Sequence, residues 1–340
     1  MVEFLNLPEE RRRLYFQQVS IETGMSEKAV EKDWWVTLVL KAVFALPMAT
    51  HFVFKGGTSL SKGWKLIERM SEDIDIALAP EAFGKLYRAA PSHRYVKQIK
   101  KEGTAYTSLV IADSLHVQLR AMGIPEELFS ISVERIKPTM PDKDPQTVFV
   151  HYASLYDANA YLADNVKVEF GVRSLKEPFD EVAILSAIGT HIQVAAYTEN
   201  PFVVRAVVPE KTMIEKLLLL HEKFSRDGVE ELVIAERQSR HLADIIRLKH
   251  QAIHQRILAD PALFQALVKH RGHYIRLRGI DYEKMTLRTL QIVPPPGIRE
   301  QFRADYEVMR TEMIYGEAPN FDTIIAELQQ LNELLQASDT

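Results

Sequence analysis

Two aspartates separated by a single residue are the clearest chemical feature of this chain. Asp73 and Asp75 lie in the segment Arg69-Met-Ser-Glu-Asp-Ile-Asp-Ile76, whose alternation of apolar and acidic residues predicts a β-strand. Because every second side chain of a strand points to the same face, the two carboxylates would lie roughly 6–7 Å apart along the chain. Oxygen ligands at that spacing can share one or two Mg²⁺ ions. The pair is therefore a candidate metal site.

A glycine turn precedes the aspartates. The apolar strand expected near 51–55 leads into Gly56 and Gly57, and Thr58 or Ser59 begins the next helix. Glycine permits positive φ and a close approach of the backbone to a ligand. Backbone N–H groups at the start of a helix attract anions such as phosphate. All four turn residues are candidate phosphate ligands.

Glu169 is the candidate for a third carboxylate. Its strand, expected at 165–170, alternates cleanly and places Glu169 on the face opposite Phe170. If this strand pairs beside the aspartate strand, three carboxylates converge, and Glu169 would help to hold a second metal ion and could accept a proton. The alternative is an exposed polar residue on a half-buried strand. For the aspartates, the alternative is a solvent-exposed pair at a strand end.

Other aspartate and glycine motifs fit this pattern less well. In phosphatases of the haloacid-dehalogenase type, an Asp-x-Asp pair directly follows a continuous apolar strand, whereas the polar run Arg69-Met-Ser-Glu72 comes first here. The turn is not a Walker loop, because Lys55 precedes the glycines and no Gly-Lys-Ser/Thr follows. Nor does it match the Gly-x-Gly-x-x-Gly dinucleotide fingerprint.

Hydrophobic periodicity predicts the elements that position these residues. Helices are expected at 8–23 and at 26–46, the second with Ser26 as its N-cap. A helix at 58–69 follows the glycine turn. The strands expected in this part of the chain are near 51–55, 72–78, 107–112, 148–152 and 165–170, with 190–208 as strands or a strand and a loop.

The character of the chain changes after Pro209. Four later segments have helical periodicity: 210–224, 229–250, 252–270 and 321–336. We therefore expect an α+β protein with two domains, residues 1–208 as a mixed sheet flanked by helices and residues 209–340 as a helical domain.

Composition narrows the class of protein. A hydrophobic fraction of 46% in 340 residues is ample for a packed core, and a net charge of −4 gives no overall attraction to nucleic acid. The absence of cysteine excludes disulfide scaffolds, cysteine-based zinc sites and thiol nucleophiles. The N-terminus lacks a signal-peptide layout, and no apolar run approaches the roughly 18 residues that span a bilayer. A cytoplasmic location without membrane attachment is expected.

A strand, Gly-Gly-Thr/Ser, a helix and a strand with Asp-x-Asp occur here in that order. This order resembles the DNA polymerase β-like nucleotidyltransferase superfamily, and the wording of Phe54-Lys-Gly-Gly-Thr-Ser-Leu60 and Ser71-Glu-Asp-Ile-Asp75 resembles its AbiEii/AbiGii toxin branch. Further segments are similar to the branch's other motifs: Glu31-Lys-Asp-Trp-Trp-Val36, Lys167-Val-Glu-Phe170, Thr212-Met-Ile-Glu-Lys216 and Arg240-His-Leu-Ala-Asp244. The resemblance covers about residues 25–250.

The resemblance implies a polymerase β-like fold and a Mg²⁺-dependent nucleotidyltransferase, with Mn²⁺ as the alternative ion. It implies transfer of NMP from an NTP to an acceptor hydroxyl, in known toxin members that of the tRNA 3′ end, and a toxin of a type IV-like toxin–antitoxin or phage-defence pair with a cognate antitoxin protein. It also implies that Lys216 contacts the β- and γ-phosphates and that Asp244 helps to position the nucleotide or an active-site lysine. The helical domain would then bind nucleotide and acceptor. His221 and His241 are given no chemical role.

Two rival hypotheses remain open. One is nucleotidyl transfer to a small molecule or to a protein hydroxyl, and the other is a non-catalytic nucleotide- or RNA-binding module. Basic segments at 85–101, 237–256 and 269–278, the last with Tyr274 as a stacking surface, favour a polyanionic acceptor, although charge-rich helices are often only solvated faces. Two mutually repelling carboxylates argue against a site without metal.

Overall fold

The computed structural model describes the whole chain except residues 138, 141, 158–161, 195–196, 226–234 and 339–340. The chain divides into two compact units. The first, here called the sheet unit, comprises residues 1–64, 70–88 and 93–207. The second, the helical unit, comprises residues 65–69, 89–92 and 208–340.

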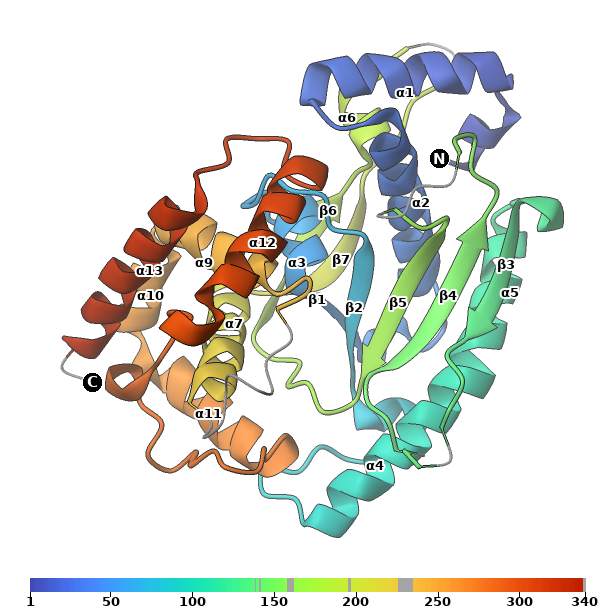
Figure 1. Cartoon of the computed structure of the whole chain (residues 1–340). Coiled ribbons are helices and arrows are strands. Elements are labelled where there is room, and N and C mark those ends of the chain that lie inside the picture. The colour runs from blue at the N-terminus through green and yellow to red at the C-terminus, as the bar shows by residue number, and fades with distance from the viewer. Residues whose placement is uncertain (138, 141, 158–161, 195–196, 226–234, 339–340) are drawn as a thin grey trace. The chain divides into compact units, whose positions relative to one another are not determined.

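A seven-stranded mixed sheet forms the sheet unit, in the order β3-β4-β5-β2-β1-β7-β6 (Figure 1). Strand β2 runs parallel to β5, and β1 runs parallel to β7, whereas the other neighbouring pairs are antiparallel. The strands are β1 (Phe52–Lys55), β2 (Asp73–Leu78), β3 (Phe129–Val133), β4 (Gln146–Tyr152), β5 (Asn165–Gly171), β6 (Phe179–Ile184) and β7 (Phe202–Val207). Together with the helices this sheet confirms the predicted α+β class.

Burial follows the predicted alternation in β2. Ile74 and Ile76 have no exposed surface, whereas Asp73 and Asp75 are half-buried on the opposite face. Burial of one isoleucine side chain is worth about 1.5–3 kcal/mol, and a one-residue slip would exchange the two faces. The core residues therefore hold the aspartates in place.

Helices complete the sheet unit: α1 (Glu9–Thr23), α2 (Glu27–Phe44), α3 (Gly56–Thr58), α4 (His93–Tyr106), α5 (Ala112–Ala121) and α6 (Ala187–His191). Ser26 caps α2 as predicted, because its hydroxyl accepts a hydrogen bond from the Ala29 N–H at 3.2 Å. The helix after the glycine turn is shorter than predicted, since α3 continues only as the π-helical turn η3 (Ser59–Gly63).

The strand predicted at 107–112 is wrong. Residues Thr107–Ile111 form the π-helical turn η5, which joins α4 to α5. The β-branched residues there suggested a strand, but Ile111, Leu115 and Leu119 recur at the four-residue helical spacing and are all fully buried. Packing of this apolar stripe outweighs local β-propensity.

In the described residues, the helical unit contains α7 (Pro209–Phe224), α9 (Ser239–His250), α10 (Ile253–Ala259), α11 (Pro261–Tyr274), α12 (Pro296–Glu312) and α13 (Phe321–Gln336). The helix predicted at 252–270 is two helices, because Asp260 caps a new helix that opens at Pro261. Part of the helix predicted at 229–250 lies outside the described residues. None of the helices in the described ranges has the length and apolarity needed to cross a bilayer.

Candidate functional site

Asp73, Asp75 and Glu169 lie on adjacent parallel strands. In the register of β2 and β5, Asp75 is the partner of Glu169 and Asp73 is the partner of Lys167. Register partners in a parallel pair point to the same face of the sheet. Strands β2 and β5 thus bring three acidic residues and Lys167 together on the half-buried face.

The glycine turn lies against this group. Gly56 has φ of +79°, and a Cβ atom at this position would lie 2.3 Å from Oδ2 of Asp75. Lys55, just before the turn, is the register partner of Asp75 in β1. A glycine is therefore required at position 56, both for the left-handed backbone and for the close approach to Asp75. Gly57 lies within the helical α3.

Replacing Gly56 with alanine should reduce nucleotide-dependent activity about 100-fold, because the methyl group would displace the Asp75 carboxylate by an ångström or more. Gly84→Ala is the matched control, since Gly84 has φ of +74° and nothing within 4 Å of its added Cβ. Both variants should lose about 1–2 kcal/mol of unfolding free energy from backbone strain. Equal activity in the two variants would contradict the role of the contact.

Thr58 and Ser59 are buried, and their hydroxyls bond within the protein. Thr58 Oγ1 donates to the carbonyl oxygen of Asp73 and lies 2.8 Å from Oγ of Ser71, while Ser59 Oγ donates to the Gly56 carbonyl at 2.9 Å. These two side chains therefore brace the turn against β2. The groups of the turn suited to an anion are the backbone N–H groups of Gly56, Gly57 and Thr58 at the helix start. The Ser59 N–H instead donates to the Gly56 carbonyl.

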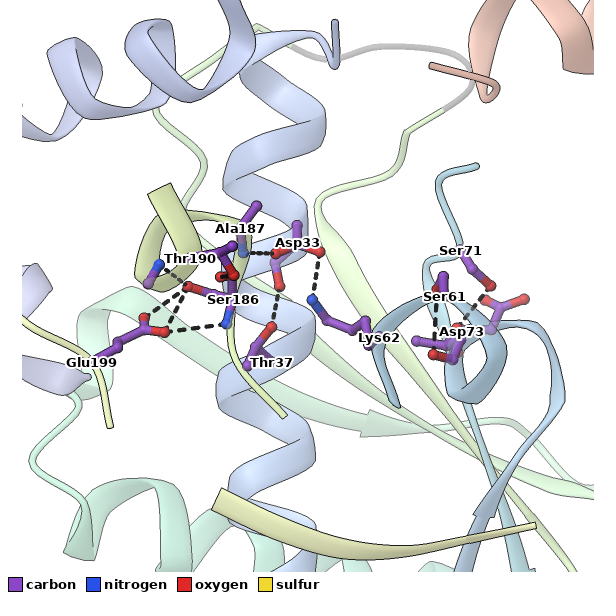
Figure 2. A network of polar contacts seen from close by, with 12 residues as sticks. Asp33, Thr37, Ser61, Lys62, Ser71, Asp73, Ser186, Ala187, Thr190 and Glu199 are labelled. Atoms are coloured by element: carbon purple, nitrogen blue, oxygen red, sulfur yellow. Dashed lines mark hydrogen bonds and ion pairs between the residues drawn. The ribbon is translucent and has the colours of Figure 1, made fainter. Parts of the chain in front are cut away.

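Helix α2 anchors the turn from its other end. Figure 2 shows Asp33 and Lys62 pointing toward one another, with their charged groups 2.5 Å apart. The second oxygen of Asp33 accepts a hydrogen bond from the Ala187 N–H at 2.7 Å. Beside it, Ser186 donates to Glu199, as Figure 2 also shows. Asp33 thus links η3, which follows the turn, to the start of α6.

Lys32 of α2 joins the beginnings of the two acidic strands. Its side chain is 2% exposed, and its ammonium donates to the carbonyl oxygens of Ala163, at 2.7 Å, and of Asn165. It also pairs with Glu72 at 3.1 Å, directly before Asp73. Sequence reasoning grouped Lys32 and Asp33 only as part of a family-like helix and assigned them no role.

Lys167 is a further member of the group that sequence reasoning did not single out. Its Nζ lies 2.8 Å from Oε1 of Glu169. Burial lowers the pKa of Lys167, but the carboxylates of Glu169, Asp73 and Asp75 outweigh burial and raise that pKa above its ordinary value. The lysine is therefore a charged cation among three acids.

The donor chemistry of this group suits a hard divalent cation, because carboxylate oxygens on neighbouring strands are the ligands that Mg²⁺ and Mn²⁺ take. Within the part of the chain that the structure describes, however, no group of three or more His, Cys, Asp or Glu side chains could hold a metal ion as it stands. Glu169 is engaged by Lys167 instead.

Lys216 and Asp244 belong to a second cluster, inside the helical unit. Asp244 is 1% exposed and accepts hydrogen bonds from Nε and Nη2 of Arg69, at 2.7 and 2.8 Å. Nζ of Lys216 lies 2.9 Å from the Asp244 carboxylate and donates to Nδ1 of His241 at 3.3 Å. Arg69 lies in the aspartate motif, where the sequence pattern does not indicate Asp244 as its partner.

Charge controls this cluster. Burial raises the pKa of Asp244, but Arg69 and Lys216 outweigh it and hold the pKa far below the usual range of an aspartate. Burial lowers the pKa of Lys216. Burial and the nearby charge of Lys216 hold the pKa of His241 well below its ordinary value. His241 is thus a neutral acceptor.

The basic segment at 269–278 is only partly a free surface. Lys269 and Arg276 are exposed and line an open groove with His273. Tyr274, predicted as a stacking surface, is only 2% exposed and stacks on His270, so that prediction is wrong. A tyrosine on the inward side of α11 serves packing.

A family model described as nucleotidyl transferase AbiEii toxin, type IV TA system, matches residues 39–327. The match includes the glycine turn, the acidic strands and the Lys216–Asp244 cluster. No curated protein matches the chain.

Proposed function

This chain belongs to the AbiEii family of nucleotidyltransferase toxins of type IV toxin–antitoxin systems, and on that premise we propose that it transfers NMP from an NTP to a hydroxyl group of RNA. The hydroxyl oxygen would bond to the α-phosphorus, and pyrophosphate would leave. The tRNA 3′ end is the first acceptor to test. A cognate antitoxin protein is the proposed partner. The proposal rests most on one observation: Asp75 lies in register with Glu169 and against Gly56.

The chain's own residues divide the work in this proposal. Asp73, Asp75 and Glu169 would hold Mg²⁺ or Mn²⁺, although Glu169 is paired with Lys167 in the structure. When bound, the cation would neutralise charge on the triphosphate and acidify the acceptor hydroxyl. Backbone N–H groups of the turn from Gly56 to Thr58 orient phosphate oxygens. Glu169 is also the proposed acceptor of the hydroxyl proton.

The proposed domain roles follow the two units. The sheet unit carries the carboxylates and the turn, and the helical unit binds nucleotide through Lys216 and Asp244. Arg69 leaves the Asp244 cluster with a net positive charge, which favours an anionic ligand. The groove beside Lys269 and Arg276 adds positive charge, although Asp281 and Glu283 line it as well. These features favour RNA over a small neutral acceptor.

A labelling screen tests the acceptor. The full chain is incubated with each α-labelled NTP in Mg²⁺, with total RNA, with candidate small molecules, or with no added acceptor. The proposal predicts label on RNA, concentrated at 3′ ends and sensitive to prior periodate oxidation of the terminal ribose. Label that appears only on the polypeptide or only on a small molecule would replace RNA as the acceptor. Tight NTP binding without transfer in Mg²⁺ or Mn²⁺ would indicate a non-catalytic binding module.

A further inference from the structure

Lys167 lies where a cation is needed. It shares a face of β5 with Glu169, and on the neighbouring strand its register partner is Asp73. Its ammonium lies 2.8 Å from the Glu169 carboxylate, and the two side chains are 35% and 22% exposed. Partial burial makes this pair less screened than one in open solvent.

Three carboxylates on one face repel one another, and a positive charge among them offsets that repulsion. Asp73 and Asp75 both contribute to the attraction felt by Lys167. Glu134, near the end of β3, also attracts Lys167 but has its own ion pair with Lys143. Glu169 is therefore the carboxylate that Lys167 holds directly.

A divalent cation at this group would compete with Lys167 for the same oxygen. The structure gives Glu169 to the lysine, and no described group of three acidic or imidazole side chains could hold a metal ion as it stands. An ion pair between neighbouring positions of one strand breaks by a rotamer change, without moving the backbone. Exchange of lysine for metal at Glu169 is thus open to the folded chain.

We propose that Lys167 is a built-in counter-ion of the carboxylate group, which holds Glu169 while no divalent cation is bound and releases it when the cation enters. The proposal rests on the proposed metal site. In this arrangement Lys167 is a positioning residue: it keeps the acidic face stable without metal and weakens metal binding by competition.

Metal binding by the full chain without NTP tests the proposal, with Mn²⁺ as the probe and electron paramagnetic resonance as the measurement. Lys167→Met keeps the apolar stem but removes the charge, so it should bind Mn²⁺ about tenfold more tightly than the parent. Lys167→Arg should bind it about as weakly as the parent does. Unchanged or weaker Mn²⁺ binding by Lys167→Met would overturn the proposal.

Thermal unfolding in EDTA supplies a second measurement. Lys167→Met should unfold at a lower temperature than the parent because the carboxylates then repel, and saturating Mn²⁺ should remove the difference. Lys100→Met is the matched control: Lys100 forms a 2.9 Å pair with Asp142 in the same unit, with side chains 21% and 20% exposed. Its Mn²⁺ affinity should equal that of the parent. An equal Mn²⁺ rescue in both variants would show a general charge effect and overturn the proposal.

A double-mutant cycle shows whether Lys167 acts through Glu169. In a Glu169→Gln background, Lys167→Met should change Mn²⁺ affinity by less than about twofold. A full tenfold change there would refute competition at Glu169. These measurements need neither NTP nor acceptor. A chain that binds Mn²⁺ tightly but transfers no nucleotide would therefore defeat the proposed function and leave the proposal about Lys167 standing.

Discussion

Asp75→Ala is expected to lower label transfer from an α-labelled NTP by about 1,000-fold or more. Loss of a group that stabilises transition-state charge lowers the rate of an enzyme on this scale. Asp75 is the carboxylate placed beside both Glu169 and Gly56. Removing it would leave the proposed metal with too few ligands. The fold should survive, because Asp75 is only half-buried and lies on the face of β2 opposite the buried Ile74 and Ile76.

Asp180→Ala is the control for this variant. Asp180 is an exposed carboxylate of the same sheet, on β6. Asp180→Ala should transfer label at the parental rate. Circular dichroism should give the same spectrum for the parent and for both variants. Undiminished transfer by folded Asp75→Ala would remove the metal mechanism.

Asp244→Ala should destabilise the chain by about 3–5 kcal/mol, the usual cost of removing one partner from a buried ion pair. Arg69 and Lys216 would both lose the carboxylate that compensates their charge. Urea unfolding measures the change. Glu307→Ala breaks an exposed pair with Arg310 in the same unit and should cost at most about 0.5 kcal/mol. Equal losses of unfolding free energy in the two variants would show that the buried cluster contributes no more to stability than the exposed pair.

The pH dependence of this difference follows from the lowered pKa of Asp244. The pKa of an aspartate in an unfolded chain is about 3.9, and the pKa of Asp244 in the folded chain lies far below it. The stabilisation that Asp244 contributes is therefore complete above the unfolded value. It is lost as the pH falls through the folded pKa. The gap between parent and Asp244→Ala should therefore stay constant from about pH 7 to 5 and shrink below about pH 4. A gap that widens toward acid would refute the assignment.

The sequence predicted the elements whose pattern is local. The alternation in β2 and β5 places the isoleucines and valines inward, and the apolar stripe of α13 was predicted at 321–336 with the observed bounds. Strands β3 and β6 were missed, because they are short edge strands with few buried side chains. Local pattern identifies an element only when one face is clearly apolar.

The composition of the site depended on long-range pairing that a single sequence does not encode locally. Lys167 reads as an ordinary polar position until β5 is placed in register beside β2. Arg69 reads as part of the aspartate motif, yet its guanidinium belongs to Asp244. In both cases the residue type was visible and its partner was not. Partner choice depends on tertiary packing.

The order of the strands has a consequence for synthesis of the protein. Strand β2 leaves the ribosome long before β5, its neighbour in the sheet, and β1 likewise waits for β7. A nascent chain that ends before Asn165 contains both aspartates but lacks Glu169 and the Asn165 carbonyl, one of the two carbonyls that Lys32 binds. A polypeptide that ends before Glu169 therefore cannot assemble the acidic face. The three acids can meet only after about half of the 340 residues have been made.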